Sequence, residues 1–379
     1  MSYELYANTD SLPTGEDIDP YSSVLLNCAR DSICDTDPHK VRHQRLLRQK
    51  DANGALFYQC KVIYPGLDFI TALGLEPINI KLFSNVFAGL PAAALRFQFT
   101  LNKPWLSRDD EAFYPIDNPL RKDWVFHVPI VPGSSWKGAL RSACVENLVF
   151  RPYTANVASD KADERFRLLQ IFGSEKGEDA TEGENEGAKK NSLTDFLDTR
   201  IDSSTKICCQ AKKAFVAKHR EWCETQHINP EKESHRLGRL HALPSYFDRM
   251  DMDVINPRKP KTRAGSIPIK MEHVPPGAKA CFSLIYFAFD LVGNRDEEIL
   301  AEAQQDWELI GQALVRMFRL SGFGAKKTSG CGRAAQDISE FEFVSTISGF
   351  KCQTPNKTTV EGLATLGNCF PGKHETNGH

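Results

Sequence analysis

The stretch Val128-Pro-Ile-Val-Pro-Gly-Ser-Ser-Trp-Lys-Gly-Ala-Leu-Arg141 joins an apolar segment to a helix through a turn. Pro132-Gly133 is a turn signal, and Ser134 is predicted to cap the helix that follows. The start of such a helix exposes unpaired N–H groups and a positive dipole end, both of which favour a phosphate. Lys137 and Arg141 are four residues apart and therefore share one helix face. The stretch predicts an anion-binding helix start.

A second stretch, Ser321-Gly-Phe-Gly-Ala-Lys-Lys-Thr-Ser-Gly-Cys-Gly-Arg333, combines glycines with cations. Its glycines allow the backbone to come close to a ligand; they are Gly322, Gly324, Gly330 and Gly332. Its positive charges are Lys326, Lys327 and Arg333. Neither stretch has the G-x-x-x-x-G-K-[ST] spacing of a nucleotide-binding P-loop. Together the two stretches indicate a grip on a polynucleotide backbone.

The periodicity of the remaining chain predicts an α+β fold. Residues 94–101 alternate as a half-buried strand, and residues 136–148 have the spacing of an amphipathic helix. Further strands are expected over 238–247, 281–289 and 332–344, with a long helix over 296–320. The order strand, helix, strand, strand, helix, strand is that of the ferredoxin-like, or split βαβ, core, which RRM modules also use.

Several segments lie outside this pattern. We expect residues 1–93 to be an N-terminal extension of unassigned fold and residues 94–345 to be the core. Residues 174–235 form an insertion, which begins with a Glu/Gly-rich run. The basic stretch 248–277 suits a protruding hairpin, and the polar residues 346–379 are predicted to be a flexible tail.

Bulk composition restricts the class of protein. The chain has 379 residues, a net charge of −2 and 11 cysteines. An odd number of scattered cysteines favours reduced thiols over a disulfide framework. Because no apolar run reaches the ~18 residues of a membrane span, we expect a cytoplasmic protein without membrane contact.

The insertion contains one group of potential zinc ligands: Cys208, Cys209, His219, Cys223 and His227. Three of them fall four residues apart and would share a helix face. Zinc sites usually include a tighter pair such as C-x2-C, and the side chains of adjacent cysteines diverge. We therefore do not expect zinc here.

Three features together resemble one family: the split βαβ order, the motif P-G-S-S-x-K-G-x-x-R at the first helix, and the motif G-x-G-x5-G-x-G after the second helix. They are similar to the RAMP superfamily of CRISPR-associated proteins, specifically the backbone-type subunits of type III effector complexes. The resemblance covers about residues 94–345 without 174–235. It implies that CRISPR RNA, target single-stranded RNA, and other RAMP-type and large subunits are the partners.

The resemblance also implies roles for particular residues. Ser134, Ser135, Lys137 and Arg141 would contact RNA, together with the glycines and cations of 321–333. The hairpin over 248–277 would be the family's thumb, which wedges into the guide–target duplex; its cations are Arg258, Lys259, Lys261 and Arg263. Leu169-x-Ile-Phe-Gly173 resembles the L-F-G that follows the family's first helix.

Ile116-Asp117-Asn118-Pro119 resembles the I-D-[NS]-P segment, whose aspartate is required for target cleavage in cleaving members. Asp117 is therefore the candidate catalytic residue and a ligand for Mg²⁺ or another divalent cation, which keeps few protein ligands. Asp109, Asp110 and Glu111 are possible assistants. Taken from the residues alone, I-D-N-P is also a good turn.

Three alternatives stay open. The N-terminal extension and the insertion also suit a non-cleaving, end-capping subunit of the same complex. A metal-independent CRISPR repeat-processing endoribonuclease of the same superfamily would use an early histidine, for which His127 is the candidate. A free-standing RRM-like RNA binder is disfavoured because the chain has no RNP1-like aromatic strand.

Overall fold

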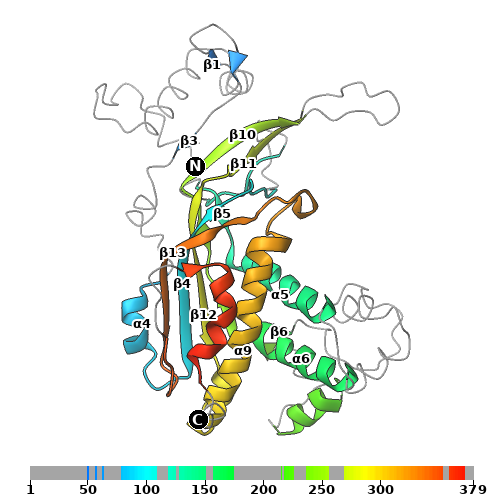
Figure 1. The fold of residues 1–379 in the computed structure, drawn as a ribbon, viewed down its shortest axis with the longest axis vertical. Coiled ribbons are helices and arrows are strands. Elements are labelled where there is room, and N and C mark those ends of the chain that lie inside the picture. Colours follow the sequence, from blue (N-terminus) through cyan, green and yellow to red (C-terminus); the bar gives the residue numbers. More distant parts are fainter. Residues whose placement is uncertain are drawn as a thin grey trace, which may run out of the picture.

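The fold is described from a computed structural model of the chain, over residues 49–50, 56–57, 62–63, 78–108, 118–124, 128–150, 157–174, 215, 217–225, 236–255, 269–352 and 358–371. It is a mixed α+β structure, as the sequence predicts. Helices cover an antiparallel sheet, and a hairpin extends from one end of that sheet (Figure 1). Among the described residues, no helix has both the length and the apolar character needed to cross a membrane.

The central sheet has the strand order β14-β13-β4-β12-β8, and every neighbouring pair is antiparallel. Its strands are β14 (Thr358–Thr359), β13 (Ala334–Ser345), β4 (Ala92–Leu101), β12 (Lys279–Phe287) and β8 (Leu240–Ala242). The middle strand β4 pairs with β12 from Thr100↔Lys279 to Ala92↔Phe287. The strands predicted over 94–101, 281–289 and 332–344 are thus confirmed within a few residues.

Strand β4 forms because its residues alternate between two environments. Leu95, Phe97 and Phe99 are almost completely buried on the face that carries α5 and α9. Arg96 and Gln98 point to the opposite face, where they are partly exposed. A strand places successive side chains on opposite faces, so this pattern fixes which face becomes the core.

Two helices cover the core face, namely α5 (Gly133–Phe150) and α9 (Asp296–Arg316) (Figure 1). Helix α9 buries a stripe at helical spacing that includes Ala303, Trp307, Ile310 and Leu314. It continues as a short π-helical turn, η4 (Met317–Ser321), into the glycine-rich stretch. Helix α6 (Val157–Phe172) packs beside α5.

The opposite face of the sheet is covered at one end by the short helix α4 (Ile80–Val86). Phe83 is buried there against Ala92 and Ala94 of β4. Phe87, just after the helix, meets Phe287 of β12 with ring centroids 4.8 Å apart. This packing assigns the segment before β4 to the folded core and not to the N-terminal extension.

The C-terminal segment differs from the sequence prediction of a flexible tail. Residues 358–371 form β14 and the 3-10 helix η6 (Glu361–Cys369), which lies along α9. Val360, Leu363 and Phe370 are fully buried. The prediction is wrong for this part because Val360, Leu363, Leu366 and Phe370 recur three or four residues apart and are buried in the core.

The hairpin consists of β10 (Arg249–Ile255) and β11 (Ile269–His273), with β3 (Val62–Ile63) on the outer edge of β10. Three short pairs complete the strands: β1 (Gln49–Lys50) with β2 (Leu56–Phe57), β5 (Ile130–Val131) with β9 (Ser245–Tyr246), and β6 (Gly173–Ser174) with β7 (Arg236–Leu237). Because β6 pairs with β7, the insertion leaves the core and returns to it at one place.

A buried ion network joins the returning chain to the helices. Arg239, only 2% exposed, donates to Asp306 at 2.7 Å and to Asp290 at 2.6 Å. The Tyr286 hydroxyl donates to Asp306 at 2.8 Å, and Arg167 of α6 donates to the same carboxylate at 2.8 Å. Burial and the neighbouring Asp306 carboxylate raise the pKa of Tyr286, so its hydroxyl keeps the donating proton.

Candidate nucleic-acid interface

The first cation-bearing stretch starts helix α5 two residues earlier than predicted. The helix begins at Gly133, and the Pro132 carbonyl accepts the Trp136 N–H at 3.1 Å. Pro132 is thus the cap position, and the prediction that Ser134 caps the helix is wrong. A side chain at Gly133 would lie 2.1 Å from the Ala242 oxygen, so glycine lets the helix start against β8.

The exposed start of α5 is electropositive. Ser134 and Ser135 are exposed in the first turn, which contains no acidic side chain. The first N–H groups of a helix have no partner within it, and the dipole there is positive. The geometry therefore leaves the helix start able to accept an anion from solvent.

Lys137, Arg141 and His241 gather at the edge strand β8. Burial and the nearby Arg141 guanidinium lower the pKa of Lys137. Burial and the Lys137 ammonium lower the pKa of His241. In each case burial is the larger cause and a neighbouring cation the smaller one; that second cause places positive charges close together here, which an anion would relieve. His241 was missed by sequence reasoning because only the tertiary structure brings β8 beside α5.

The glycines of the second stretch close a loop on itself. Gly322 and Gly332 are buried and have φ values of 71° and 70°. A side chain at Gly332 would lie 1.9 Å from the Phe323 oxygen, and Phe323 N–H donates to the Gly332 oxygen at 3.0 Å. A side chain at Gly324 would meet Trp105 at 2.5 Å. At these three positions the close approach is to the protein's own chain, whereas Gly330 has only the Arg333 side chain nearby.

The cationic side chains of this loop differ in their exposure to solvent. Lys326 is exposed in a left-handed conformation, with φ 54° and Nζ 3.8 Å from the Met271 sulfur. Lys327 and Arg333 are partly buried. The Arg333 Nε atom is buried and has no hydrogen-bond partner within the described residues. The loop therefore presents positive charge beside the hairpin strand β11.

A direct aromatic contact joins the two stretches. Trp136 of α5 and Phe323 of the glycine loop pack with ring centroids 4.5 Å apart, and both rings are buried. The Trp136 indole N–H donates to the Ser245 hydroxyl at 2.9 Å. Trp136 and Trp307 are thus core residues, as predicted. The two stretches, nearly 200 residues apart, share one structural base.

The residues that follow Asp117 lie against the hairpin base. Asn118 forms a parallel bridge with Met271, and its carbonyl accepts the Glu272 N–H at 3.0 Å. Asp117 itself, its possible assistants Asp109, Asp110 and Glu111, and His127 lie outside the described residues. The hairpin cations Arg258, Lys259, Lys261 and Arg263 lie outside them too. Roles for all of these remain predictions.

The potential zinc ligands, for which no zinc is expected, are only partly within the described chain. His219 and Cys223 are adjacent on one helical turn, with sulfur-to-nitrogen distances of 3.8 and 3.9 Å. Cys208, Cys209 and His227 fall outside the described residues. Within the part of the chain that the structure describes, no three His, Cys, Asp or Glu side chains gather to hold a metal ion.

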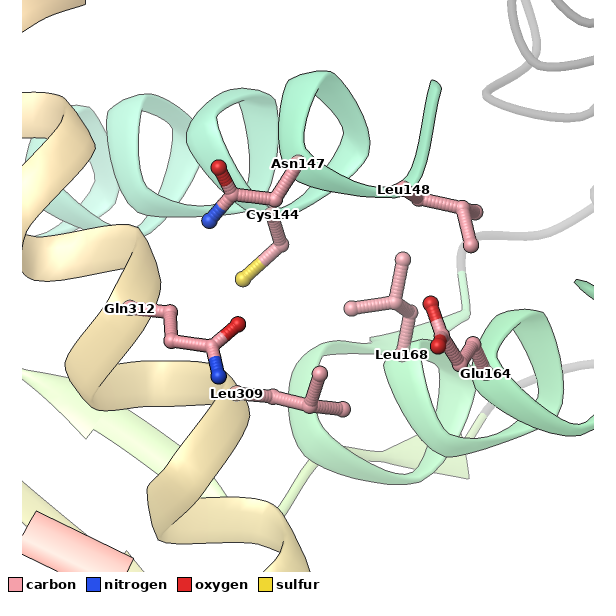
Figure 2. Close-up of a pocket in the computed structure, with 7 residues that line it drawn as sticks. All are labelled: Cys144, Asn147, Leu148, Glu164, Leu168, Leu309 and Gln312. Carbon is pink, nitrogen blue, oxygen red and sulfur yellow. The ribbon is translucent and has the colours of Figure 1, made fainter. Parts of the chain in front are cut away.

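A small crevice lies between the later turns of α5, helix α6 and helix α9 (Figure 2). Its lining residues are Cys144, Asn147, Leu148, Glu164, Leu168, Leu309 and Gln312. Burial raises the pKa of the Cys144 thiol, which therefore stays protonated. Cys144 is ten residues from Ser134, or ~15 Å along the helix. The crevice is a packing seam remote from the start of α5.

Comparison with known proteins identifies the family. A sequence profile of the RAMP superfamily matches residues 79–335. A 61-residue stretch is 38% identical to CRISPR system Cms endoribonuclease Csm3 of Streptococcus thermophilus. The stretch makes up 16% of this chain and 26% of that relative. A solved structure of the type III-B Cmr-beta bound to cognate target RNA aligns with a TM-score of 0.41 and 12% identity, over 89% of this chain and 81% of that one. Because the family profile spans most of the chain, this protein belongs to the RAMP superfamily.

Proposed function

We propose that this chain is a backbone-type subunit of a type III CRISPR ribonucleoprotein. It binds CRISPR RNA and the paired target single-stranded RNA, beside other RAMP-type and large subunits. The observation that carries the proposal is the Trp136–Phe323 contact, which joins the two cation-bearing stretches at one core. Membership of the superfamily and the stretch similar to a CRISPR endoribonuclease support it.

The proposal includes a ferredoxin-like core. In chain order the main elements are β4, α5, β8, β12, α9 and β13. In the sheet, β4 lies between β13 and β12, and β8 takes the edge. Two βαβ units interleaved in this order correspond to the split βαβ arrangement. The β10–β11 hairpin, which projects from the end of this sheet, is then the thumb.

The proposed grip has three parts. Ser134, Ser135, Lys137 and Arg141 bind guide phosphates at the start of α5. Lys326, Lys327 and Arg333 bind phosphates at the glycine loop, while Gly322, Gly324, Gly330 and Gly332 shape its backbone. The thumb cations Arg258, Lys259, Lys261 and Arg263 contact the guide–target duplex.

Target cleavage is proposed to depend on Asp117. RNA scission needs the 2′-hydroxyl aligned with its own phosphate, and a divalent ion would offset charge on the non-bridging oxygens. The described residues contain no group of three His, Cys, Asp or Glu side chains that could hold such an ion. Cleavage that stops in EDTA and returns with Mg²⁺ would support a metal-dependent reaction.

Asp117→Ala in the assembled complex tests cleavage. We expect the cut assigned to this subunit to disappear while guide RNA content stays the same. An unchanged cleavage pattern would leave the non-cleaving, end-capping subunit as the function. The insertion that leaves the core at the β6–β7 pair is a separate reason to consider an end-capping subunit.

RNA that co-purifies with the tagged chain from its native cells tests the broader proposal. Short RNAs of one length with a common repeat-derived end would support a CRISPR effector. If the chain is instead monomeric and RNA-free, and if it cuts a repeat hairpin in EDTA, it is a repeat-processing nuclease.

A further inference from the structure

Glu272 of β11 is bonded repeatedly to one segment of the chain, residues 118–122. Its backbone N–H donates to the Asn118 oxygen at 3.0 Å. Its Oε2 atom accepts the Leu120 N–H at 2.9 Å. The Lys122 ammonium lies 2.7 Å from the same Oε2 and 2.9 Å from Oε1. Glu272 thus contacts alternate residues of this segment, through its backbone at Asn118 and through its carboxylate at Leu120 and Lys122.

The Glu272–Lys122 ion pair is buried, and this burial indicates what the pair contributes. Glu272 is 3% exposed and the Lys122 side chain 10% exposed. A buried carboxylate is costly unless it is paired and hydrogen-bonded, and a buried ion pair is weak evidence for stability. Its best-attested use is to specify one register among several. If residues 118–122 were shifted by one position, the carboxylate would lose the Leu120 N–H and the Lys122 ammonium.

The same segment leads directly into the start of α5. Lys122 forms a bridge with Pro129, and Ile130 N–H donates to the Arg121 oxygen at 3.1 Å. Three residues later Gly133 begins the helix. Glu272 therefore lies where the hairpin base, the residues after Asp117 and the first cation-bearing stretch are joined.

We infer that Glu272 is a positioning residue that sets where the chain following Asp117 lies relative to the thumb. The inference rests on the proposed function, because it supposes target cleavage at Asp117. Glu272 acts there through residues 118–122 and does not itself contact RNA. It predicts that the carboxylate determines both how fast and where the target is cut. A purely structural role predicts a change in stability alone.

The test compares Glu272→Gln and Glu272→Ala with the unmodified subunit in the assembled complex. We expect guide RNA content to stay constant. Single-turnover cleavage at saturating target should fall by roughly 100-fold, because small misplacements at a reacting centre have effects of that size. The remaining cuts should spread to neighbouring positions. Hydrogen exchange in peptides covering residues 118–124 should accelerate by roughly tenfold or more.

Asp248→Asn is the matched control. Asp248 is also buried, 4% exposed, and accepts the Lys279 N–H at 2.8 Å near the hairpin base. None of the hydrogen bonds to residues 118–122 described above comes from Asp248. We expect normal cut positions and normal exchange over 118–124 in this variant. Equal effects of Asp248→Asn and Glu272→Gln would overturn the inference in favour of general hairpin stability.

Hydrogen exchange over residues 118–124 distinguishes an error in this inference from an error in the proposed cleavage at Asp117. If Asp117→Ala cuts normally or the complex does not cut, cleavage at Asp117 is wrong. The exchange of residues 118–124 then decides alone whether Glu272 positions them. Unchanged exchange and unchanged cleavage in both Glu272 variants would overturn the inference whatever Asp117 does.

Discussion

At the scale of single residues, the glycines of the cationic loop are constrained by the chain itself. Gly330 and Gly332 both have positive φ, at 80° and 70°. Only at Gly332 would a side chain collide with backbone, 1.9 Å from the Phe323 oxygen. These two positions therefore separate the cost of a left-handed conformation from the cost of a steric clash.

We predict that Gly330→Ala lowers the free energy of unfolding by about 1 kcal/mol, the cost of a left-handed alanine. Gly332→Ala should lower it by more than about 3 kcal/mol, because backbone must also move. Denaturant unfolding of the two variants measures the difference. Equal losses would show that the loop relaxes freely around Gly332.

His241 supplies a pH-dependent prediction at the same scale. Its pKa is lowered from the ordinary 6.5 by burial and then by Lys137. Between about pH 6.5 and the lower pKa of the folded state, the unfolded chain therefore binds a proton that the folded chain does not, and stability is lost as pH falls through this window. Lys137→Gln should raise the pKa of His241 and weaken this loss.

An NMR titration of the His241 ring measures that pKa directly. Lys103→Gln removes an exposed lysine that does not contribute to the shift and is the control. A His241 pKa that is the same in Lys137→Gln and in the unmodified protein would contradict the electrostatic coupling across the β8 edge.

At the scale of elements, the C-terminal helix η6 behaves as part of the core. A side chain at Gly311 of α9 would lie 2.2 Å from the Leu363 oxygen of η6. The two helices therefore approach closely enough to exclude a methyl group. In contrast, a side chain at Gly138 of α5 would meet nothing within 4 Å.

Gly311→Ala should accordingly push η6 from α9 and lower the free energy of unfolding by about 2–4 kcal/mol. Gly138→Ala should raise it by about 0.5–1 kcal/mol, since alanine is the better helix former. Thermal unfolding of the matched pair provides the measurement. Similar effects of the two substitutions would mean that η6 docks loosely.

At the scale of the whole molecule, the fold concentrates charge that the composition conceals. The net charge is −2, yet the cation-bearing start of α5 and the cation-bearing glycine loop are joined at one core by the Trp136–Phe323 contact. Acidic residues begin α9 at the other end, where Asp296, Glu297 and Glu298 occupy the first turn. RNA binding should therefore depend on local and not on total charge.

We predict that Lys137→Gln reduces the slope of log affinity against log salt by about 0.7 for single-stranded RNA, the loss of one phosphate contact. Arg295→Gln removes an 80% exposed cation paired with Glu298 and should leave the slope unchanged. Equilibrium titrations at several salt concentrations measure both. An unaltered slope in Lys137→Gln would contradict phosphate contact at α5.

Much of this protein follows from local sequence. The alternation of Leu95, Phe97 and Phe99 and the helical stripe through Trp307 determined the main strands and helices, because each pattern needs only one apolar face. The two cation-bearing stretches were also evident, since turn residues and charges act over short distances. The resemblance to the RAMP superfamily rested on these same stretches, and the family profile that matches residues 79–335 confirms it.

Only the tertiary structure decided how distant residues combine. Leu120 and Glu272 are separated by 152 positions, and no local periodicity predicts their hydrogen bond. Gly322 and Gly332 are needed for backbone contacts within the loop, which spacing alone did not distinguish from contact with a ligand. The buried carboxylate and the crowded glycines have the same physical basis: their free energies depend on neighbours that long-range folding supplies.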